Sequence, residues 1–236
     1  MLNSCVTYMS MMTEIEEDSI FEHSIDFWDH FCTLYSEMAT KGDNRNPEEV
    51  LNLGNNKQEE MLEYFNGFFD SHSKTKLMNS IIEHMPKPQE VMFVLDENGF
   101  PKKIVFENTS HSICYEKNKN ILCTMARTNF VGLSGVFKEH ITRMSGYGSN
   151  ELMNLNRICW AIGTVSGSVS LNEERLFLVK VLKTLLNMVD TYKKIQEKST
   201  VATNIMYIVG QYPKFIVASK EFFWCIITKL FQFMQN

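Results

Sequence analysis

Ile158-Cys159-Trp160-Ala161-Ile162-Gly163 is repeated further along the chain as Ile205-Met206-Tyr207-Ile208-Val209-Gly210. Both copies read as isoleucine, any residue, a large aromatic residue, any residue, an aliphatic residue and glycine, and 47 residues separate them. An internal repeat with a period between about 20 and 50 residues is typical of proteins that stack small helical units. The stretch therefore predicts an all-α solenoid, in which each unit packs against the next.

Each copy is expected to lie on an amphipathic helix that a second helix follows. Apolar residues recur every three to four positions, which predicts one buried face per helix. These residues are Leu155, Ile158, Ile162, Val165 and Val169 in the first copy, and Val201, Ile205, Ile208 and Tyr212 in the second. Two helices in a unit of this length match the HEAT and armadillo kinds of repeat.

Glycine occupies the same place in both copies, at Gly163 and Gly210. Glycine inside a helix costs about 1 kcal/mol relative to alanine. We therefore expect a neighbouring helix to pass close to each of the two glycines. The positions that the copies share are interpreted as structural repeat positions: Ile158, Trp160, Gly163, Ile205, Tyr207 and Gly210.

The whole chain, residues 1–236, is predicted to be a single solenoid segment of HEAT-type helix pairs with one inserted β-hairpin. Hydrophobic residues make up 44% of the sequence, enough for a continuous core, and five prolines leave long helices intact. The predicted parts are helices over 1–87 with a loop at 40–58, a hairpin insertion at 88–108, a helix pair at 109–148, and repeats at 149–196 and 197–236. Within 109–148, the second helix is expected to begin at about Phe130.

The hairpin prediction rests on two β-rich runs, at 91–95 and 104–106, with Asn98-Gly99 between them. Asn-Gly between such runs favours a two-residue type I′ turn. That turn would place Leu95 opposite Lys102 and Phe93 opposite Ile104. Because a lone two-stranded hairpin is marginally stable in water, we expect it to lie along the helices with one apolar face buried.

The last predicted helix is apolar on almost every side, since Trp224, Phe231 and Phe233 lie outside its inward stripe. A helix of that kind is normally buried on both sides. A terminal solenoid unit has a polar outer face instead. The pattern therefore predicts that further repeats or another chain cover this helix.

Charge and cysteine content narrow the class of protein. The net charge of −5 and the pI of about 5.7 argue against nucleic-acid binding, which normally needs a basic face. Six scattered cysteines without a CxxC pair predict reduced thiols in a cytosolic or nuclear protein. The N-terminus shows no signal-peptide pattern, and the apolar runs are shorter than a membrane span needs.

Catalytic and metal-binding patterns are weak throughout the sequence. Ser166 lies in a glycine-rich stretch that lacks the spacing of a nucleophile elbow, and we interpret its small residues as helix packing. His111, Cys114 and Cys123 could supply three metal ligands, but their spacing fits no standard zinc pattern. We therefore expect no catalytic residue, no metal and no cofactor. A hydrolase that uses Ser166 is an alternative that no other feature supports.

Two long stretches, 154–167 and 202–215, closely resemble the middle of the exportin-1 type of nuclear export receptor, within the karyopherin-β family. They read Asn-Leu-Asn-Arg-Ile-Cys-Trp-Ala-Ile-Gly-Thr-Val-Ser-Gly and Ala-Thr-Asn-Ile-Met-Tyr-Ile-Val-Gly-Gln-Tyr-Pro-Lys-Phe. The resemblance extends loosely from Tyr8 to Met234, with a poorer match at 40–80. It covers a central part of a much longer family protein and implies a HEAT-repeat fold.

The resemblance gives the hairpin, at about 90–107, a function. In the family, the corresponding insertion is an acidic hairpin that crosses the inner face and touches the small GTPase Ran. The resemblance therefore implies that four acidic residues of this chain contact Ran and contribute to cargo release. These are Glu90, Asp96, Glu97 and Glu107. Lys102 and Lys103 stand where the family is more acidic, so this hairpin is nearly neutral. Solvated turn residues are the alternative interpretation.

The resemblance also implies partners and a location. Family members carry cargo with leucine-rich export signals through nuclear pores, together with Ran in its GTP state, and shuttle between nucleus and cytoplasm. Their export-signal groove lies on repeats beyond the position of Met234, so cargo binding is expected only through repeats missing from this chain. Nucleoporins are further candidate partners. The alternative is a HEAT-repeat interaction scaffold unrelated to Ran, since a repeat fold alone does not specify a function.

Overall fold

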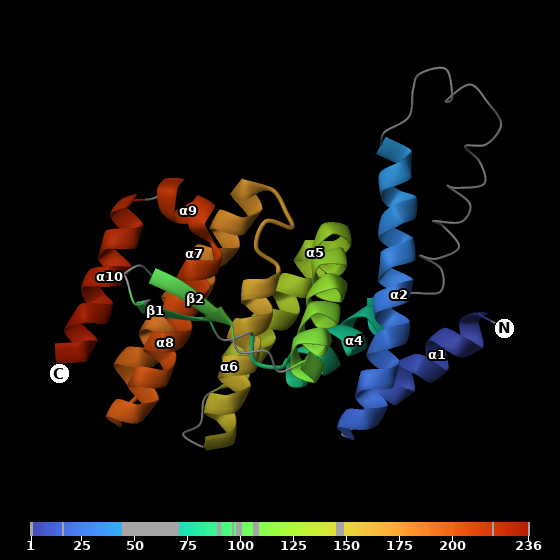
Figure 1. The fold of residues 1–236 in the computed structure, drawn as a ribbon, viewed down its shortest axis with the longest axis horizontal. Coiled ribbons are helices and arrows are strands. Elements are labelled where there is room, and N and C mark those ends of the chain that lie inside the picture. Colours follow the sequence, from blue (N-terminus) through green and yellow to red (C-terminus); the bar gives the residue numbers. More distant parts are fainter. Residues whose placement is uncertain are drawn as a thin grey trace.

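The computed structural model describes residues 2–15, 17–43, 71–88, 91–95, 97, 101–105, 109–144, 149–218 and 220–235. Its helices follow one another from α1 at one end of the molecule to α10 at the other (Figure 1). They are α1 (Leu2–Thr13), α2 (Asp18–Asp43), α4 (Ser71–Glu83), α5 (Thr109–Arg143), α6 (Ser149–Thr164), α7 (Leu171–Thr191), α8 (Ile195–Gln211), α9 (Pro213–Ala218) and α10 (Lys220–Gln235). This arrangement agrees with the predicted helical solenoid.

One apolar core runs through these helices from α1 to α10. Each helix contacts near neighbours: α2 packs on α5, α6 on α8, and α7 on α8. The helical parts of the two predicted stripes face this core, because Ile158 and Ile205 are both at most 1% exposed. Val165 and Val169 were predicted on the same helix as Ile158, but they lie beyond the end of α6 at Thr164. Among the described residues, no helix is long and apolar enough to cross a lipid bilayer.

The interface between α6 and α8 brings the two copies of the repeat together. The hydroxyl of Tyr212, on the second copy, donates a hydrogen bond of 2.7 Å to the carbonyl oxygen of Ile162 on the first. The Nδ2 of Asn204 also donates to the Oδ1 of Asn156, at 2.6 Å. The first contact is buried and the second is partly buried. They fix how α8 sits against α6, because a polar group left unpaired there would be costly.

The two repeat glycines have different surroundings. A Cβ atom built on Gly163 would lie 2.6 Å from Cε1 and 2.8 Å from the hydroxyl oxygen of Tyr207. At Gly210 the same construction meets no atom within 4 Å among the described residues. The close neighbour expected at both glycines is therefore present at Gly163, where α8 passes, and is not found at Gly210.

Asn129 interrupts α5, with backbone angles of φ −152° and ψ 67°. Its side-chain Oδ1 accepts a hydrogen bond of 3.0 Å from the backbone N–H of Gly132. This contact is an N-cap, which satisfies one of the free N–H groups of a new helix. The two helices expected within 109–148 are thus the two parts of α5, and the second starts at Phe130 as predicted.

Strands β1 (Val91–Leu95) and β2 (Pro101–Val105) form an antiparallel pair. Phe93 pairs with Lys103 and Leu95 with Pro101, so the predicted register was wrong by one residue. The reason is the length of the connection, residues 96–100, which is longer than the two-residue Asn-Gly turn. A shift of one residue exchanges the faces of every side chain in one strand relative to the other.

The hairpin does not lie along the helices as expected. Each strand contacts the other strand and comes close to no helix in the part of the chain that the structure describes. The two strands satisfy each other's backbone hydrogen bonds, so a helix surface is not needed to pair them. The hairpin therefore stands off the helical layers, between the end of α4 and the start of α5.

Three other sequence predictions need comment. Ser166 and Gly167 do not lie in a helix, because α6 ends at Thr164; Gly167 has φ +77°, which glycine adopts without strain. Apolar spacing in the second helix of the first repeat, now α7, predicts that Leu176 lies on its buried face, but Leu176 is 57% exposed. The predicted loop at 40–58 begins inside α2, which continues to Asp43, and the rest of it lies outside the described residues.

His140 provides a pH-dependent contribution to stability. Its Nε2 lies 2.8 Å from the Oδ1 of Asn79, and burial lowers the pKa of its imidazole, against a raising effect of Glu83. The unfolded chain therefore binds this proton more readily, so stability is complete above about pH 6.5 and declines as the pH falls toward the lower folded pKa. We expect His140→Gln, which keeps an amide donor, to lose less free energy of unfolding than the wild type between pH 7.5 and 5.5. Urea titrations at both pH values test this, and equal losses would contradict it.

Candidate partner-binding sites

The hairpin presents one described acidic side chain. Glu97 lies in the turn between β1 and β2 and is exposed. The other three predicted Ran-contacting residues, Glu90, Asp96 and Glu107, lie outside the described residues. The structure thus positions one member of the predicted acidic set, on a hairpin that contacts no described helix.

A second candidate site is a groove between the part of α5 after Asn129 and α7, called here the α5–α7 groove. It has a volume of about 570 Å³. The aromatic ring of Phe177 lines the groove and contacts Phe130 edge-on, with ring centroids 5.4 Å apart. The lining residues are Phe130, Val131, Ser134, Gly135, Lys138, Ile141 and Thr142 of α5, and Glu173, Leu176, Phe177, Lys180, Val181, Lys183 and Thr184 of α7.

The edges of the α5–α7 groove combine exposed apolar and basic side chains. Val131 is 81% exposed and Leu176 is 57% exposed. Lys138, Lys180 and Lys183 are exposed, and none of them forms an ion pair with a described residue. Apolar side chains that remain exposed next to one another are typical of binding grooves.

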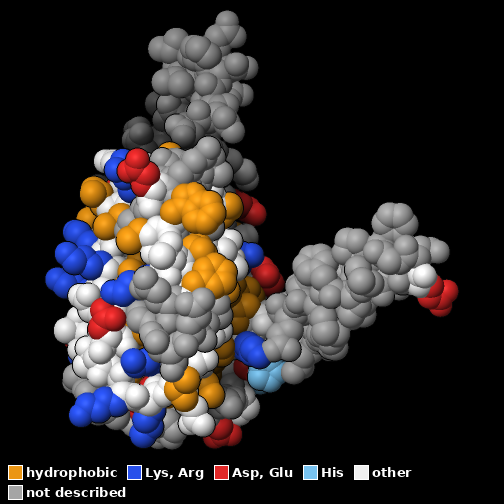
Figure 2. All heavy atoms as spheres, turned by 90° about the vertical axis from the view of Figure 1, so that its left-hand side faces the viewer, with side chains coloured by type: hydrophobic (Ala, Val, Ile, Leu, Met, Phe, Trp, Pro, Cys, Tyr) orange, Lys and Arg blue, Asp and Glu red, His pale blue; other side chains and the backbone are white. Residues whose placement is uncertain are grey.

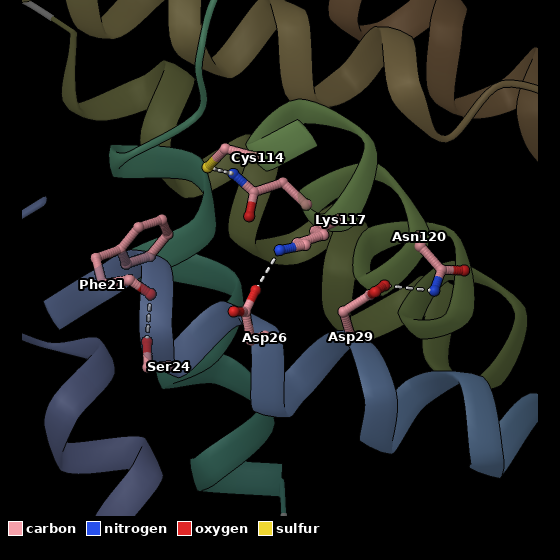
Figure 3. Close-up of polar contacts among 8 residues, drawn as sticks. Phe21, Ser24, Asp26, Asp29, Cys114, Lys117 and Asn120 are labelled. Atoms are coloured by element: carbon pink, nitrogen blue, oxygen red, sulfur yellow. Dashed lines mark hydrogen bonds and ion pairs between the residues drawn. The ribbon is translucent and has the colours of Figure 1, made fainter. Parts of the chain in front are cut away.

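The polar seam between α2 and α5 has a different character (Figure 3). Lys117 points toward Asp26 and forms an ion pair with it, and the Nδ2 of Asn120 donates to the Oδ1 of Asp29 at 2.7 Å. A small cavity of about 220 Å³ lies next to Lys117 and Asp26. Because these charges are paired within the chain, the seam joins α2 to α5 and offers little to a ligand.

The residues that could have supplied metal ligands, His111, Cys114 and Cys123, have different surroundings. His111 is exposed, whereas the thiol of Cys123 donates to the carbonyl oxygen of Thr164 at 3.2 Å and so faces α6. The described residues contain no group of three or more His, Cys, Asp or Glu side chains arranged to hold a metal ion. Burial raises the pKa of the Cys32 thiol to about 12, which makes it unreactive.

Comparison with known proteins relates the chain to exportins. A family model described as CRM1 / Exportin repeat 3 matches residues 150–196. Exportin 1A of Arabidopsis thaliana is 30% identical over 97% of this chain, and exportin-1 of Schizosaccharomyces pombe is 30% identical over 98% of it. Exportin-1 of Drosophila melanogaster is 28% identical over the full chain. Along 97% or more of its length, the chain is thus similar to exportin-1 proteins.

The chain spans about a fifth of the length of these exportin-1 relatives, since the matches cover 22%, 22% and 21% of them. The exportin repeat model covers α6 and α7 and ends at the start of α8. It therefore includes the first copy of the repeated stretch and one wall of the α5–α7 groove.

The α5–α7 groove was missed by the sequence reasoning, although α7 carried a signal for it. Besides Glu174, its buried positions are all apolar: Phe177, Leu178, Val181, Leu182, Leu185 and Val189. These fill the inward stripe without Leu176, which is thus an extra apolar residue on the adjacent face. In this chain, an apolar residue in excess of the core stripe marks a surface groove.

Proposed function

We propose that this chain acts as part of a nuclear export receptor of the exportin-1 type. It would work together with Ran in its GTP state, on cargo with leucine-rich export signals, while moving between nucleus and cytoplasm. The support is similarity to proteins named exportin along 97% or more of the chain. Such a receptor works by binding and needs no catalytic residue. In a receptor of this kind, Ran and cargo raise each other's affinity by an equal factor.

The hairpin is the part of this chain that we assign to Ran contact. The observation behind the assignment is the exposed Glu97 on a hairpin that comes close to no described helix. An acidic side chain placed in this way can approach a basic partner surface without disturbing the core. Complementary charge of this kind increases the rate of association and orients the partner more than it adds affinity.

The proposal predicts selective, charge-dependent binding to Ran. The purified chain should bind Ran loaded with a GTP analogue in preference to Ran-GDP, and raised salt should weaken the binding. Reversing Glu97 to lysine should slow association several-fold, because an attractive charge becomes repulsive. Stopped-flow or surface plasmon resonance kinetics would measure the change.

A matched control is Glu221→Lys, which changes the net charge equally at an exposed position of α10, a helix that the described strands do not contact. Equal effects of the two substitutions would contradict a specific hairpin contact. A folded, monodisperse chain that binds neither form of Ran would contradict a Ran site on this chain. It would favour the alternative of a HEAT-repeat scaffold with other partners.

A further inference from the structure

We propose that the α5–α7 groove binds an acidic amphipathic helix of a partner protein. This inference does not depend on Ran binding, because the groove is formed by α5 and α7 and includes no residue of the hairpin. Three properties of the groove lead to it: an apolar floor, a basic edge and a shape that fits a rod.

The floor of the groove is apolar and held in place by the core. Phe177 is 8% exposed, Val181 is 5% exposed and Ile141 is 4% exposed, so each is anchored in the interior while it lines the groove. Val131 and Leu176 add apolar surface at the edges and are largely exposed. Burial of such surface by a partner is favourable by about 25 cal/mol for each Å².

The charges at the groove select an acidic partner. Lys138 on α5 and Lys180 and Lys183 on α7 carry the positive charge, and none is paired with a described acid. The single acidic lining residue is Glu173, at the N-terminus of α7. Its Oε2 accepts a hydrogen bond of 2.6 Å from the hydroxyl of Ser170. Basic groups at the edge of an apolar groove complement acidic residues that flank an apolar stripe.

The dimensions of the groove suit a helix. Its lining residues extend from Phe130 to Thr142 on α5, which corresponds to about 18 Å at 1.5 Å per residue. A partner helix of three to four turns would therefore fill it, with apolar side chains at every third or fourth position on the floor. A membrane surface is a poorer fit, because Phe177 and Val181 are recessed between two helices and a flat bilayer would not reach them.

The probe is a fluorescein-labelled peptide of about four helical turns, with leucine at every third or fourth position and glutamate at the others. One control peptide carries lysine in place of glutamate, and a second carries alanine in place of leucine. Fluorescence anisotropy with the full chain should show binding of the first peptide alone, and binding should weaken as salt is raised. Equal binding of the lysine peptide would overturn the proposed charge selection.

Two sets of substitutions locate the binding. The first set combines Lys138→Glu, Lys180→Glu and Lys183→Glu. It should lower the affinity for the acidic peptide at least about tenfold, or about 1.4 kcal/mol. The matched set Lys193→Glu, Lys198→Glu and Lys214→Glu lies outside the groove and should leave the affinity unchanged. Equal losses in the two sets would overturn the proposal, as would an absence of binding to the wild type.

The apolar edge needs its own variant, Val131→Ser with Leu176→Ser. Both residues are largely exposed, so the melting temperature should stay within about 2 °C of the wild type, while the peptide affinity falls several-fold. Unchanged affinity would contradict the groove. Vesicles that contain phosphatidylserine test the membrane alternative. Vesicle binding that the groove lysine set abolishes, with no binding of the acidic peptide, would replace a protein partner by a lipid surface.

Discussion

Replacing Trp28 with alanine is expected to lower the free energy of unfolding by about 3–5 kcal/mol, the range measured for large-to-small substitutions of buried aromatic residues. Trp28 is completely buried in α2. Its indole N–H donates to the Oγ1 of Thr13 in α1 at 3.0 Å, and its ring packs edge-on against Phe31 at a centroid distance of 5.7 Å. The substitution therefore removes packing and a helix-to-helix hydrogen bond together.

The loss should be concentrated near the N-terminal end of the molecule. Units of a solenoid contact only their neighbours, so destabilisation spreads poorly along it. Urea unfolding followed by circular dichroism would give the overall loss. Amide hydrogen exchange should then show early opening of α1 and α2, with α7 and α8 protected as in the wild type.

Trp224 provides the matched control for this substitution. It lies on α10 and is 64% exposed, so Trp224→Ala should change the free energy of unfolding by less than about 1 kcal/mol. Helix α10 forms the left-hand end of Figure 1 and so faces the reader in Figure 2, where exposed apolar side chains lie among basic ones. Similar losses for the two tryptophans would show that burial does not set the effect.

The helical plan could be predicted because its determinants are local. Apolar residues at helical spacing, such as Leu155 and Ile158, face the core wherever the helix packs, so periodicity alone identifies the buried side. The break before Phe130 was also predictable, since Asn129 and Gly132 supply the cap within four residues of sequence. These features need no knowledge of the rest of the fold.

The register of the hairpin and the α5–α7 groove depend on longer-range geometry. Asn98-Gly99 favoured a two-residue turn, but the length of the connection between Leu95 and Pro101 decided the pairing. The groove exists because the kink at Asn129 gives the second part of α5 its own course beside α7. A sequence pattern can report that Leu176 is apolar, and the relative placement of two helices decides whether it is covered.

Replacing Gly163 with alanine is expected to destabilise the protein by up to about 2 kcal/mol, because overpacking costs about 1–3 kcal/mol and helix propensity returns only about 1 kcal/mol of it. The new methyl group would lie 2.6 Å from Cε1 of Tyr207, closer than carbon atoms can approach. The Tyr207 ring is half-buried against the core, and so it cannot move away without loss of contacts. This cost exceeds the gain of about 1 kcal/mol that alanine brings to a helix.

Gly210→Ala is the natural control, because it places the same change at the equivalent position of the second copy. Nothing described lies within 4 Å of the added methyl group there, so this substitution should stabilise by up to about 1 kcal/mol. If the two substitutions change the free energy of unfolding in opposite directions, the contact with Tyr207, and not helix propensity, explains why residue 163 is glycine. Destabilisation by both would contradict this.

A double-mutant cycle separates the clash from other effects of the substitution. In a Tyr207→Ala background the ring is absent, so Gly163→Ala should no longer destabilise and should gain the same helix propensity as Gly210→Ala. The interaction energy of the pair would then measure how closely α8 approaches α6. A penalty at Gly163 that persists without the ring would place the conflict elsewhere in that interface. The repeated glycine would then need an explanation independent of the aromatic residue that recurs with it.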